Sequence, residues 1–255
     1  MNESSKKSLG QWLVGLYAVP NLPLIAEGSD LGELIVDSVL KDGFSVADRD
    51  VIIVAQKVVS KAEGAIVRLA DVEPSPRAIE LSESTGRDPR LCEIYLREST
   101  EILGTKGRMV ITRHRLGFIC TGAGVDRSNV APHDEGVVVL LPRDPDHSAS
   151  QIRRKIRERT KADVGVIISD SFGKPDREGS IGIAIGIAGI RHLEVRQQKD
   201  LFENPAKSSI ALVDELAAAA SLIMGQADEG RPVVIVRGAN YTPDEEASIK
   251  RLLIE

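Results

Sequence analysis

Short runs of aliphatic and β-branched residues recur along this chain and alternate with longer stretches that mix apolar and charged positions. Runs of this kind, bordered by turn residues, predict buried strands. They are DVIIVA (50–55), RMVIT (108–112), GVVVLLP (136–142), VGVIIS (164–169), IGIAIGIAG (181–189) and PVVIVRG (232–238). The alternation of strand-like and helix-like segments predicts a mixed α/β fold.

Capping residues predict where helices begin and end. A hydroxyl or carboxylate side chain followed by proline opens segments 75–86 and 88–104, and glycine closes each of them. Thr-Pro followed by three acids opens a further helix over 242–253. Segment 208–225 is the longest apolar helix and should be buried on most sides. Segment 148–160 carries isoleucines on one face and many basic residues, which favours a solvated helix face over a phosphate-binding surface.

One predicted strand has an unusual texture. Isoleucine occupies positions 181, 183, 185 and 187, while glycine or alanine occupies the positions between them. Alternate residues of a strand face opposite sides, so the isoleucine face predicts core. The small face would allow close approach by a flat ligand, another sheet or a second subunit. Tight sheet packing is the commonest of these causes.

No repeat, low-complexity segment or Pro/Gly/Ser-rich linker divides the chain. We therefore expect residues 10–255 to form a single catalytic unit, with room for two lobes, behind a flexible tail over 1–9. The early run LGQWLVGLYAVP is too short and too interrupted for a signal peptide. No run approaches the roughly 20 apolar residues of a membrane span. Cys92 and Cys120 form no CxxC motif and suit free thiols in a cytoplasmic protein.

Composition narrows the classes of ligand. Aromatic residues make up only 3% of the chain, so the core must be aliphatic. The net charge of −5 argues against a general nucleic-acid binder, which would carry a basic excess. An anionic ligand would have to be held by local basic residues or by metal ions.

Several familiar catalytic motifs are missing from the sequence. It contains no GxxxxGK[ST] loop, no GxGxxG after a strand, no HExxH and no GxSxG. These absences point away from P-loop and Rossmann nucleotide sites, and the scattered histidines give no zinc motif.

Two oxygen-rich stretches each follow a predicted strand. TGAGVDRSNV (121–130) contains Asp126, and GVIISDSFGKPDREG (165–179) contains Asp170 followed by Ser171. Carboxylates from two strand ends could meet around Mg²⁺ or Mn²⁺, which take oxygen ligands and keep waters. Taken alone, each aspartate is also explained by ordinary turn and capping chemistry.

A third stretch, AQKVVSKAEG (55–64), places Lys57 and Lys61 directly after a strand. If the segment stays extended, both ammonium groups share a face and could hold a polyphosphate. A solvated strand edge is the alternative explanation for two such lysines.

Taken together and in this order, these motifs resemble one family, the coenzyme F420-0:L-glutamate (γ-glutamyl) ligases. The resemblance also covers LPLIAEGSDLGELI (22–35), LLPRDPDHSA (140–149), VDELAAAASLIMG (213–225) and VVIVRG (233–238). It implies that family's α+β fold of mixed sheets, distinct from P-loop and Rossmann folds. It also implies a homodimer without the fused flavin-binding domain of some relatives.

The resemblance further implies which residues bind ligands. Asp126 and Asp170 would hold one metal ion, Mn²⁺ or Mg²⁺, and Ser171 and Gln226 would help hold a second. It also allows for K⁺. The GTP-binding residues would be Leu22, Pro23, Leu24, Ile25, Gln56, Lys57, Lys61, Asn129, Met224, Gly225, Gln226, Ala227, Asp228, Glu229, Gly230 and Arg231.

The implied activity is that of a GDP-forming acid–amino-acid ligase. It would join L-glutamate to the carboxylate of the deazaflavin precursor F420-0 through an acyl phosphate, in the cytoplasm, on small molecules only. The residues name no general base. Asp176 stands where relatives often carry an aromatic residue, DLFENPAKSS (200–209) lacks their Gly-Arg pair, and Gln226 replaces an acid found in some. A paralogous ligase with another acid acceptor, or a non-catalytic nucleotide-binding protein, are therefore the alternatives.

Overall fold

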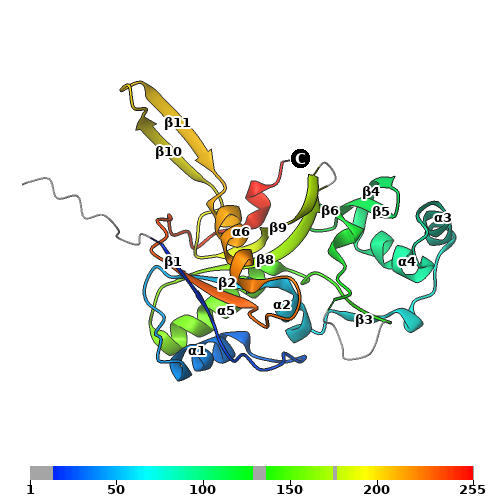
Figure 1. Ribbon diagram of the computed structural model, residues 1–255, viewed down its shortest axis with the longest axis horizontal. Helices are drawn as coiled ribbons and strands as arrows, with labels where there is room; N and C mark the ends of the chain where they lie inside the picture. The colour runs from blue at the N-terminus through cyan, green and yellow to red at the C-terminus, as the bar shows by residue number, and fades with distance from the viewer. Residues whose placement is uncertain (1–13, 129–135, 175–176, 255) are drawn as a thin grey trace, which may run out of the picture.

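The computed structural model describes residues 14–128, 136–174 and 177–254. The tail expected over 1–9, together with Asn129 and Asp176, lies outside the described residues. Figure 1 shows a central sheet flanked by helices, a smaller group of strands and helices to its right, and a hairpin that projects from the top.

The central sheet has five strands in the order β1-β12-β2-β8-β9. They are β1 (Gly15–Ala18), β12 (Val233–Arg237), β2 (Val51–Ala55), β8 (Gly165–Lys174) and β9 (Arg177–Ala188). Strands β2 and β8 pair in parallel, and the other pairs are antiparallel. The mixed α/β class is confirmed, and four strands predicted from apolar runs form this sheet with β1, which the sequence pattern did not predict.

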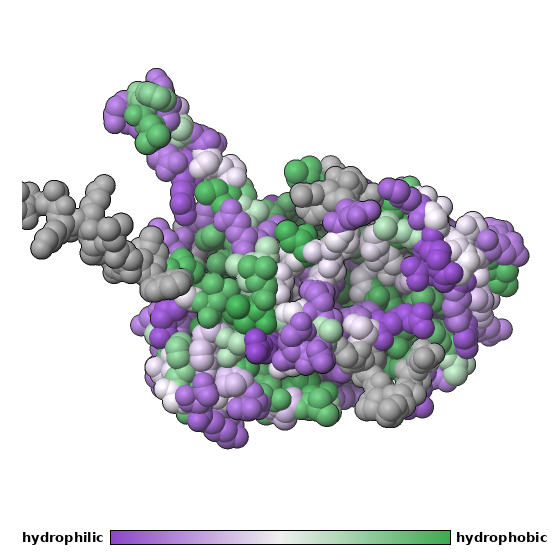
Figure 2. Space-filling model, viewed as in Figure 1, coloured by the Kyte–Doolittle hydropathy of each residue, from purple (hydrophilic) through white to green (hydrophobic). Residues whose placement is uncertain are grey.

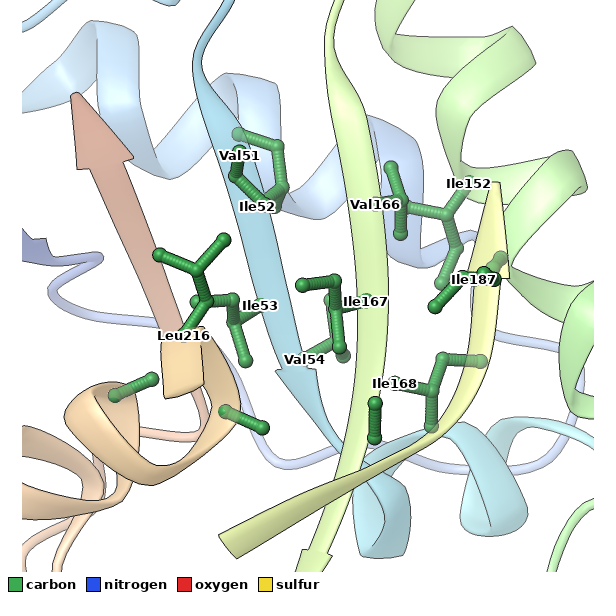
Figure 3. Close-up of a cluster of buried hydrophobic side chains, with 14 of the residues drawn as sticks. Val51, Ile52, Ile53, Val54, Ile152, Val166, Ile167, Ile168, Ile187 and Leu216 are labelled. Carbon is green, nitrogen blue, oxygen red and sulfur yellow. The ribbon is translucent and has the colours of Figure 1, made fainter. Parts of the chain in front are cut away.

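The middle of the sheet is buried on both faces, which explains the continuous apolar runs. Residues 51–54 of β2 and 166–168 of β8 are fully buried, as are 233–236 of β12. Figure 3 shows Ile53 and Ile167 from the two parallel strands side by side, with Leu216 of a covering helix beside them. The core is aliphatic, as the scarcity of aromatic residues predicted.

Helices cover both faces of the sheet. Helices α1 (Leu31–Lys41) and α5 (Pro145–Thr160) pack together on one face, and α6 (Leu212–Met224) lies on the other. The basic run of α5 is not simply a solvated face, because Arg153 is buried and forms ion pairs with Asp163 at 2.6 Å and Glu245 at 2.7 Å. Arg153 therefore links α5 to the segment before β8, which contains Asp163, and to the segment after β12, which contains Glu245.

A bulge changes the expected alternation along β9. Ile168 pairs with Gly186 but Ser169 pairs with Ala184, so Ile185 is an extra residue that reverses the facing of the strand. A Cβ at Gly182 would lie 2.6 Å from the carbonyl oxygen of residue 217 in α6, and one at Gly186 would lie 2.4 Å from Pro145 in α5. The small residues therefore let α6 and α5 approach β9 closely from opposite faces. This differs from the tight sheet packing that we expected.

A second group of elements has its own apolar cluster, built around Leu91, Ile94, Tyr95 and Val110. It contains helices α3 (Pro76–Thr85) and α4 (Pro89–Arg97), and the three-stranded sheet β4 (Ser99–Lys106), β5 (Met109–His114) and β6 (Ile119–Thr121). A two-stranded sheet, β3 (Ile66–Arg68) with β7 (Val137–Val139), leads into it; short 3₁₀ turns at Leu69–Asp71 and Gly122–Gly124 complete the group.

Three predicted helices are shorter than expected. The one expected over 208–225 begins only at Leu212, because residues 208–210 belong to a strand. The helix expected over 88–104 ends at Arg97, because the β-branched segment after it pairs with β5 instead. The helix expected over 242–253 shrinks to a 3₁₀ turn at Ile249–Leu252. The Thr242 hydroxyl, which would have capped that helix, donates to Glu194 at 2.9 Å. The hydroxyl that was expected to cap the helix is thus engaged in a tertiary hydrogen bond instead.

Strands β10 (Glu194–Lys199) and β11 (Pro205–Ile210) form the projecting hairpin. Its tip carries Leu201 and Phe202, which are 97% and 84% exposed, and Figure 2 shows hydrophobic atoms gathered there. Within the described residues, the helices are too short or too polar to cross a membrane.

Candidate functional site

Strand direction brings the predicted site segments to one edge of the central sheet. Strands β1, β2 and β8 run the same way, so their carboxyl ends meet at this edge, and β12 begins there because it runs the opposite way. Helix α2 (Gln56–Ala62) follows β2 directly, and the backbone N–H of Ala55 donates to Pro232 at 2.8 Å. Ligands commonly bind outside the carboxyl ends of strands in open α/β sheets.

A cavity of about 690 Å³ opens at this edge. Seventeen of the residues predicted to bind the nucleotide or metal line it: Leu22, Pro23, Leu24, Ile25, Gln56, Lys57, Lys61, Asp126, Asp170, Ser171, Met224, Gly225, Gln226, Ala227, Asp228, Gly230 and Arg231. Glu229 does not line the cavity. Its carboxylate accepts a hydrogen bond from the backbone N–H of Ala227 at 2.8 Å and so stabilises the loop between α6 and β12.

Asp126 lies at the centre of a small charged cluster. Its Oδ2 is 2.9 Å from Nζ of Lys57, and its Oδ1 accepts from both the backbone N–H and the hydroxyl of Ser128, at 2.8 and 2.9 Å. Lys57 also donates to the Ser128 hydroxyl at 2.7 Å. Burial raises the pKa of Asp126, but these contacts outweigh it and hold the pKa below its usual value.

The backbone before Asp126 explains its position. Gly122, Ala123 and Gly124 all have positive φ angles, between 51° and 64°, so the chain turns tightly there. The carbonyl and N–H of Asp126 then both bond to Val139 in an isolated bridge, at 2.8 and 2.9 Å. The glycine-rich motif therefore serves to hold the Asp126 side chain toward the sheet edge.

Asp170 comes from the central sheet. The expected strand over 164–169 continues to Lys174, so Asp170 lies within β8 rather than after it, one residue beyond the end of its pairing with β2. Burial, the largest influence, and the charge of Asp126 raise the pKa of Asp170, while the backbone of Ser171 and the charge of Lys57 oppose the rise, so that the pKa is about 7. A cation bound between two neighbouring carboxylates would stabilise their charged forms.

Ser171 and Gln226 meet across the cavity. The Gln226 amide nitrogen donates to the Ser171 hydroxyl at 3.0 Å. This contact ties β8 to the loop between α6 and β12. Both side chains offer neutral oxygens, so neither adds a charge to the pair of aspartates.

The two lysines lie on a helix, so the expected extended segment is wrong. Lys57 and Lys61 are one helical turn apart on α2 and line the same cavity, which preserves their shared face through a different geometry. Burial and then the charge of Lys57 lower the pKa of Lys61, with Asp126 opposing. Gln56 is buried, and its amide nitrogen donates to Ser60 and to the carbonyl of Leu140.

Sequence reasoning missed part of the lining. Ser169, Ser221 and Gly182 also face the cavity. Ser221 belongs to a helix that the sequence showed only as apolar, so no local signal marked it. Gly182 was visible as a small residue, but its place at the cavity depends on the packing of α6 against β9.

The donor set can be tested against the metals that the resemblance implied. Within the described part of the chain, no cluster of three or more His, Cys, Asp or Glu side chains could hold a metal ion alone. Asp126 and Asp170 do share one cavity, with the oxygens of Ser171 and Gln226 nearby. Mg²⁺ commonly uses one or two carboxylates plus substrate phosphates and water, so this set suits a metal that arrives with a polyphosphate.

Fold and cavity together define an α/β protein with a binding site of acids, lysines and small polar groups at strand ends, outside the P-loop and Rossmann classes. The family model for F420-0:gamma-glutamyl ligase matches residues 20–238, and the chain belongs to that family.

Similar curated proteins carry the name coenzyme F420:L-glutamate ligase. The protein from Methanothermobacter thermautotrophicus is 44% identical over 227 residues, covering 88% of this chain and 89% of its own length. The protein from Methanopyrus kandleri is 48% identical over 223 residues (86% and 85%). The one from Archaeoglobus fulgidus is 40% identical over 252 residues (94% and 98%).

Proposed function

We propose that this protein is a GTP-dependent ligase that joins L-glutamate to the carboxylate of F420-0 and so builds the γ-glutamyl tail of coenzyme F420. The observation that carries the proposal is the meeting of Asp126, Asp170 and two lysines in one cavity, in a chain of this family. A triphosphate brings about four negative charges, which the lysines and metal ions would balance.

The proposed reaction has two balanced steps. An oxygen of the acceptor carboxylate attacks the γ-phosphorus of GTP; the bond from that phosphorus to the bridging oxygen breaks, and GDP leaves with its electrons. The glutamate amine then attacks the acyl carbon, the C–N bond forms, and inorganic phosphate leaves. The amine proton passes to phosphate or water.

The chain's own side chains have distinct proposed tasks. Lys57 and Lys61 would contact phosphate oxygens from α2, and the apolar residues at 22–25 would pack against the guanine. Asp126, Asp170, Ser171 and Gln226 would hold Mn²⁺ or Mg²⁺. Such an ion, when bound, neutralises negative charge on the transferring phosphoryl group.

We also propose a cytoplasmic homodimer. Cys92 and Cys120 are free and buried, as suits a reducing compartment. The β10–β11 hairpin projects away from the core with Leu201 and Phe202 exposed at its tip. Large apolar residues displayed this way usually mark a contact with another chain. A second copy is the partner we propose.

The decisive test is mass spectrometry of the products formed from F420-0, L-glutamate, GTP and Mn²⁺. We expect a product with added glutamate, and full GDP release only when both acids are present. Asp170→Asn should abolish turnover while the circular dichroism spectrum stays native, and the exposed control Asp71→Asn should leave turnover intact. Amide formation with a different acid would favour the paralogous ligase, and GTP binding without any product would favour a non-catalytic protein.

A further inference from the structure

Two smaller cavities open beside the candidate site, and all three share the same two residues. One has a volume of about 250 Å³ and the other about 420 Å³. Asp126 and Ser128 line both of them and the main cavity as well. Three cavities therefore meet at Asp126, an arrangement that suits a reaction with three substrates.

The 420 Å³ cavity belongs to the second group of elements and is strongly basic. Arg87 precedes α4, Arg108 precedes β5 and Arg127 follows Asp126, and all three line the cavity. The Nε of Arg87 donates to the backbone carbonyl oxygen of Arg108 at 2.8 Å, which ties the Arg87 side chain to the backbone at Arg108. Within the described ranges, none of the three forms an ion pair with a carboxylate.

The described lining of this cavity carries more positive than negative charge. Among the described residues that line it, Asp126 is the single acid, and it is already bonded to Lys57. Tyr95 also lines the cavity; burial raises its pKa, so the phenol stays protonated, and both Arg87 and Arg127 are close enough to oppose that rise. A local excess of guanidinium groups in a chain of net charge −5 marks a place for an anion.

We propose that this arginine pocket, formed by Arg87, Arg108, Arg127 and Tyr95, binds the oxyanion groups of an acidic substrate other than the nucleotide. The inference rests on the proposed ligase function and adds a substrate site to it. Guanidinium forks pair with carboxylate and phosphodiester oxygens in two-point contacts, and the phenol adds a neutral donor.

Position separates this pocket from the nucleotide site. The lysines and the apolar residues at 22–25 line the main cavity and not the arginine pocket, and the three arginines do not line the main cavity. Asp126 and Ser128 border both cavities, so an acid held by the arginines would reach the place proposed for phosphoryl transfer past these two residues. L-Glutamate, with two carboxylates, and F420-0, with a phosphodiester and a carboxylate, both present this chemistry.

The experiment compares Arg108→Gln, Arg127→Gln and the double variant with the wild type. Calorimetry measures binding of L-glutamate, of F420-0 and of GDP, each alone and with GDP and Mn²⁺ present, and steady-state assays give KM for each substrate. Arg77→Gln is the matched control, because it removes the same charge from an exposed position on α3 that lines none of these cavities. The conservative variant Arg108→Lys/Arg127→Lys tests whether charge alone suffices.

We expect the double variant to weaken binding and raise KM by about tenfold or more for L-glutamate or for F420-0, with GDP binding and the KM for GTP within about twofold of wild type. Whichever acid responds is the one that the pocket holds, and lysine should restore only part of the loss. Equal affinities in wild type and variants, an equal loss with Arg77→Gln, or a loss confined to the nucleotide would overturn the proposal. If the wild type binds an acid through these arginines yet makes no amide, the ligase assignment fails and the binding site stands.

Discussion

The ion pair between Lys57 and Asp126 gives a quantitative test of how the site holds charge before any ligand binds. The two atoms are 2.9 Å apart, and the side chains are only 22% and 28% exposed. A double-mutant cycle with Lys57→Met, Asp126→Asn and both together removes each charge in turn while keeping similar side-chain volumes.

The expected coupling follows from distance and exposure. Two unit charges 2.9 Å apart attract by about 6 kcal/mol at an effective dielectric constant near 20. Loss of hydration offsets most of this, so we expect a net coupling of about 1–2 kcal/mol. Lys57→Met alone should cost about 1–3 kcal/mol, because it leaves Asp126 partly buried without its cation and beside Asp170. Adding Asp126→Asn should recover part of that loss.

Urea unfolding of the metal-free protein in EDTA at neutral pH measures the coupling free energy. The control cycle uses Lys199 and Glu203 on the hairpin, which form an ion pair at 2.6 Å but are 65% and 77% exposed. Their coupling should stay below about 0.5 kcal/mol. If the Lys57–Asp126 coupling were no larger than that of the exposed pair, our account of the site as a partly desolvated charge cluster would be wrong.

Two further predictions concern the parts that flank the site. Hydrogen bonds from Ser75 and then Arg97 lower the pKa of Glu93 to about 2, so its stabilisation is complete above the unfolded pKa near 4.5 and is lost as pH falls toward 2. Glu93→Gln should therefore lower the free energy of unfolding by about 2 kcal/mol at pH 6 and by much less at pH 2.5. Chemical denaturation at the two pH values measures this difference. An equal loss of stability at both pH values would contradict the prediction. Replacing Leu201 and Phe202 by serine should convert the proposed dimer to a monomer in analytical ultracentrifugation, and a variant that sediments like a dimeric wild type would remove the hairpin tip from the interface.

Local sequence predicted the strands of the central sheet well because both of their faces are buried. A continuous run such as residues 51–54 can hardly be anything but interior. Strands β2, β8, β9 and β12 all overlap the predicted runs, although β8 ends later and β9 begins earlier than predicted. Two caps formed as predicted: Ser75 caps α3, and Asp88 caps α4 while also forming an ion pair with Arg90. At Thr242 the hydroxyl bonds to Glu194 instead, and most of the expected helix does not form.

The candidate site shows the same division. Motif resemblance selected residues of which nearly all that are described line one cavity, but the roles assigned to them stay predictions. Residue spacing alone gave the wrong backbone for Lys57 and Lys61, since a shared face arises at separations of four on a helix as well as on a strand. The arginine pocket carried no sequence signal, because Arg87, Arg108 and Arg127 stand in separate segments.

The order of amino acids was enough to identify the interior segments, the residues that could supply oxygen ligands or positive charge, and the family that the chain resembles. These properties depend only on side-chain type and on the spacing of residues that are close in sequence. Tertiary structure alone decided that Asp126 and Asp170 share a cavity with Lys57, because that depends on strand direction and on the bridge from Asp126 to Val139. It also decided that three arginines gather beside them. Side chains far apart in sequence combine into a site only when the packing of the strands and helices that carry them brings them together.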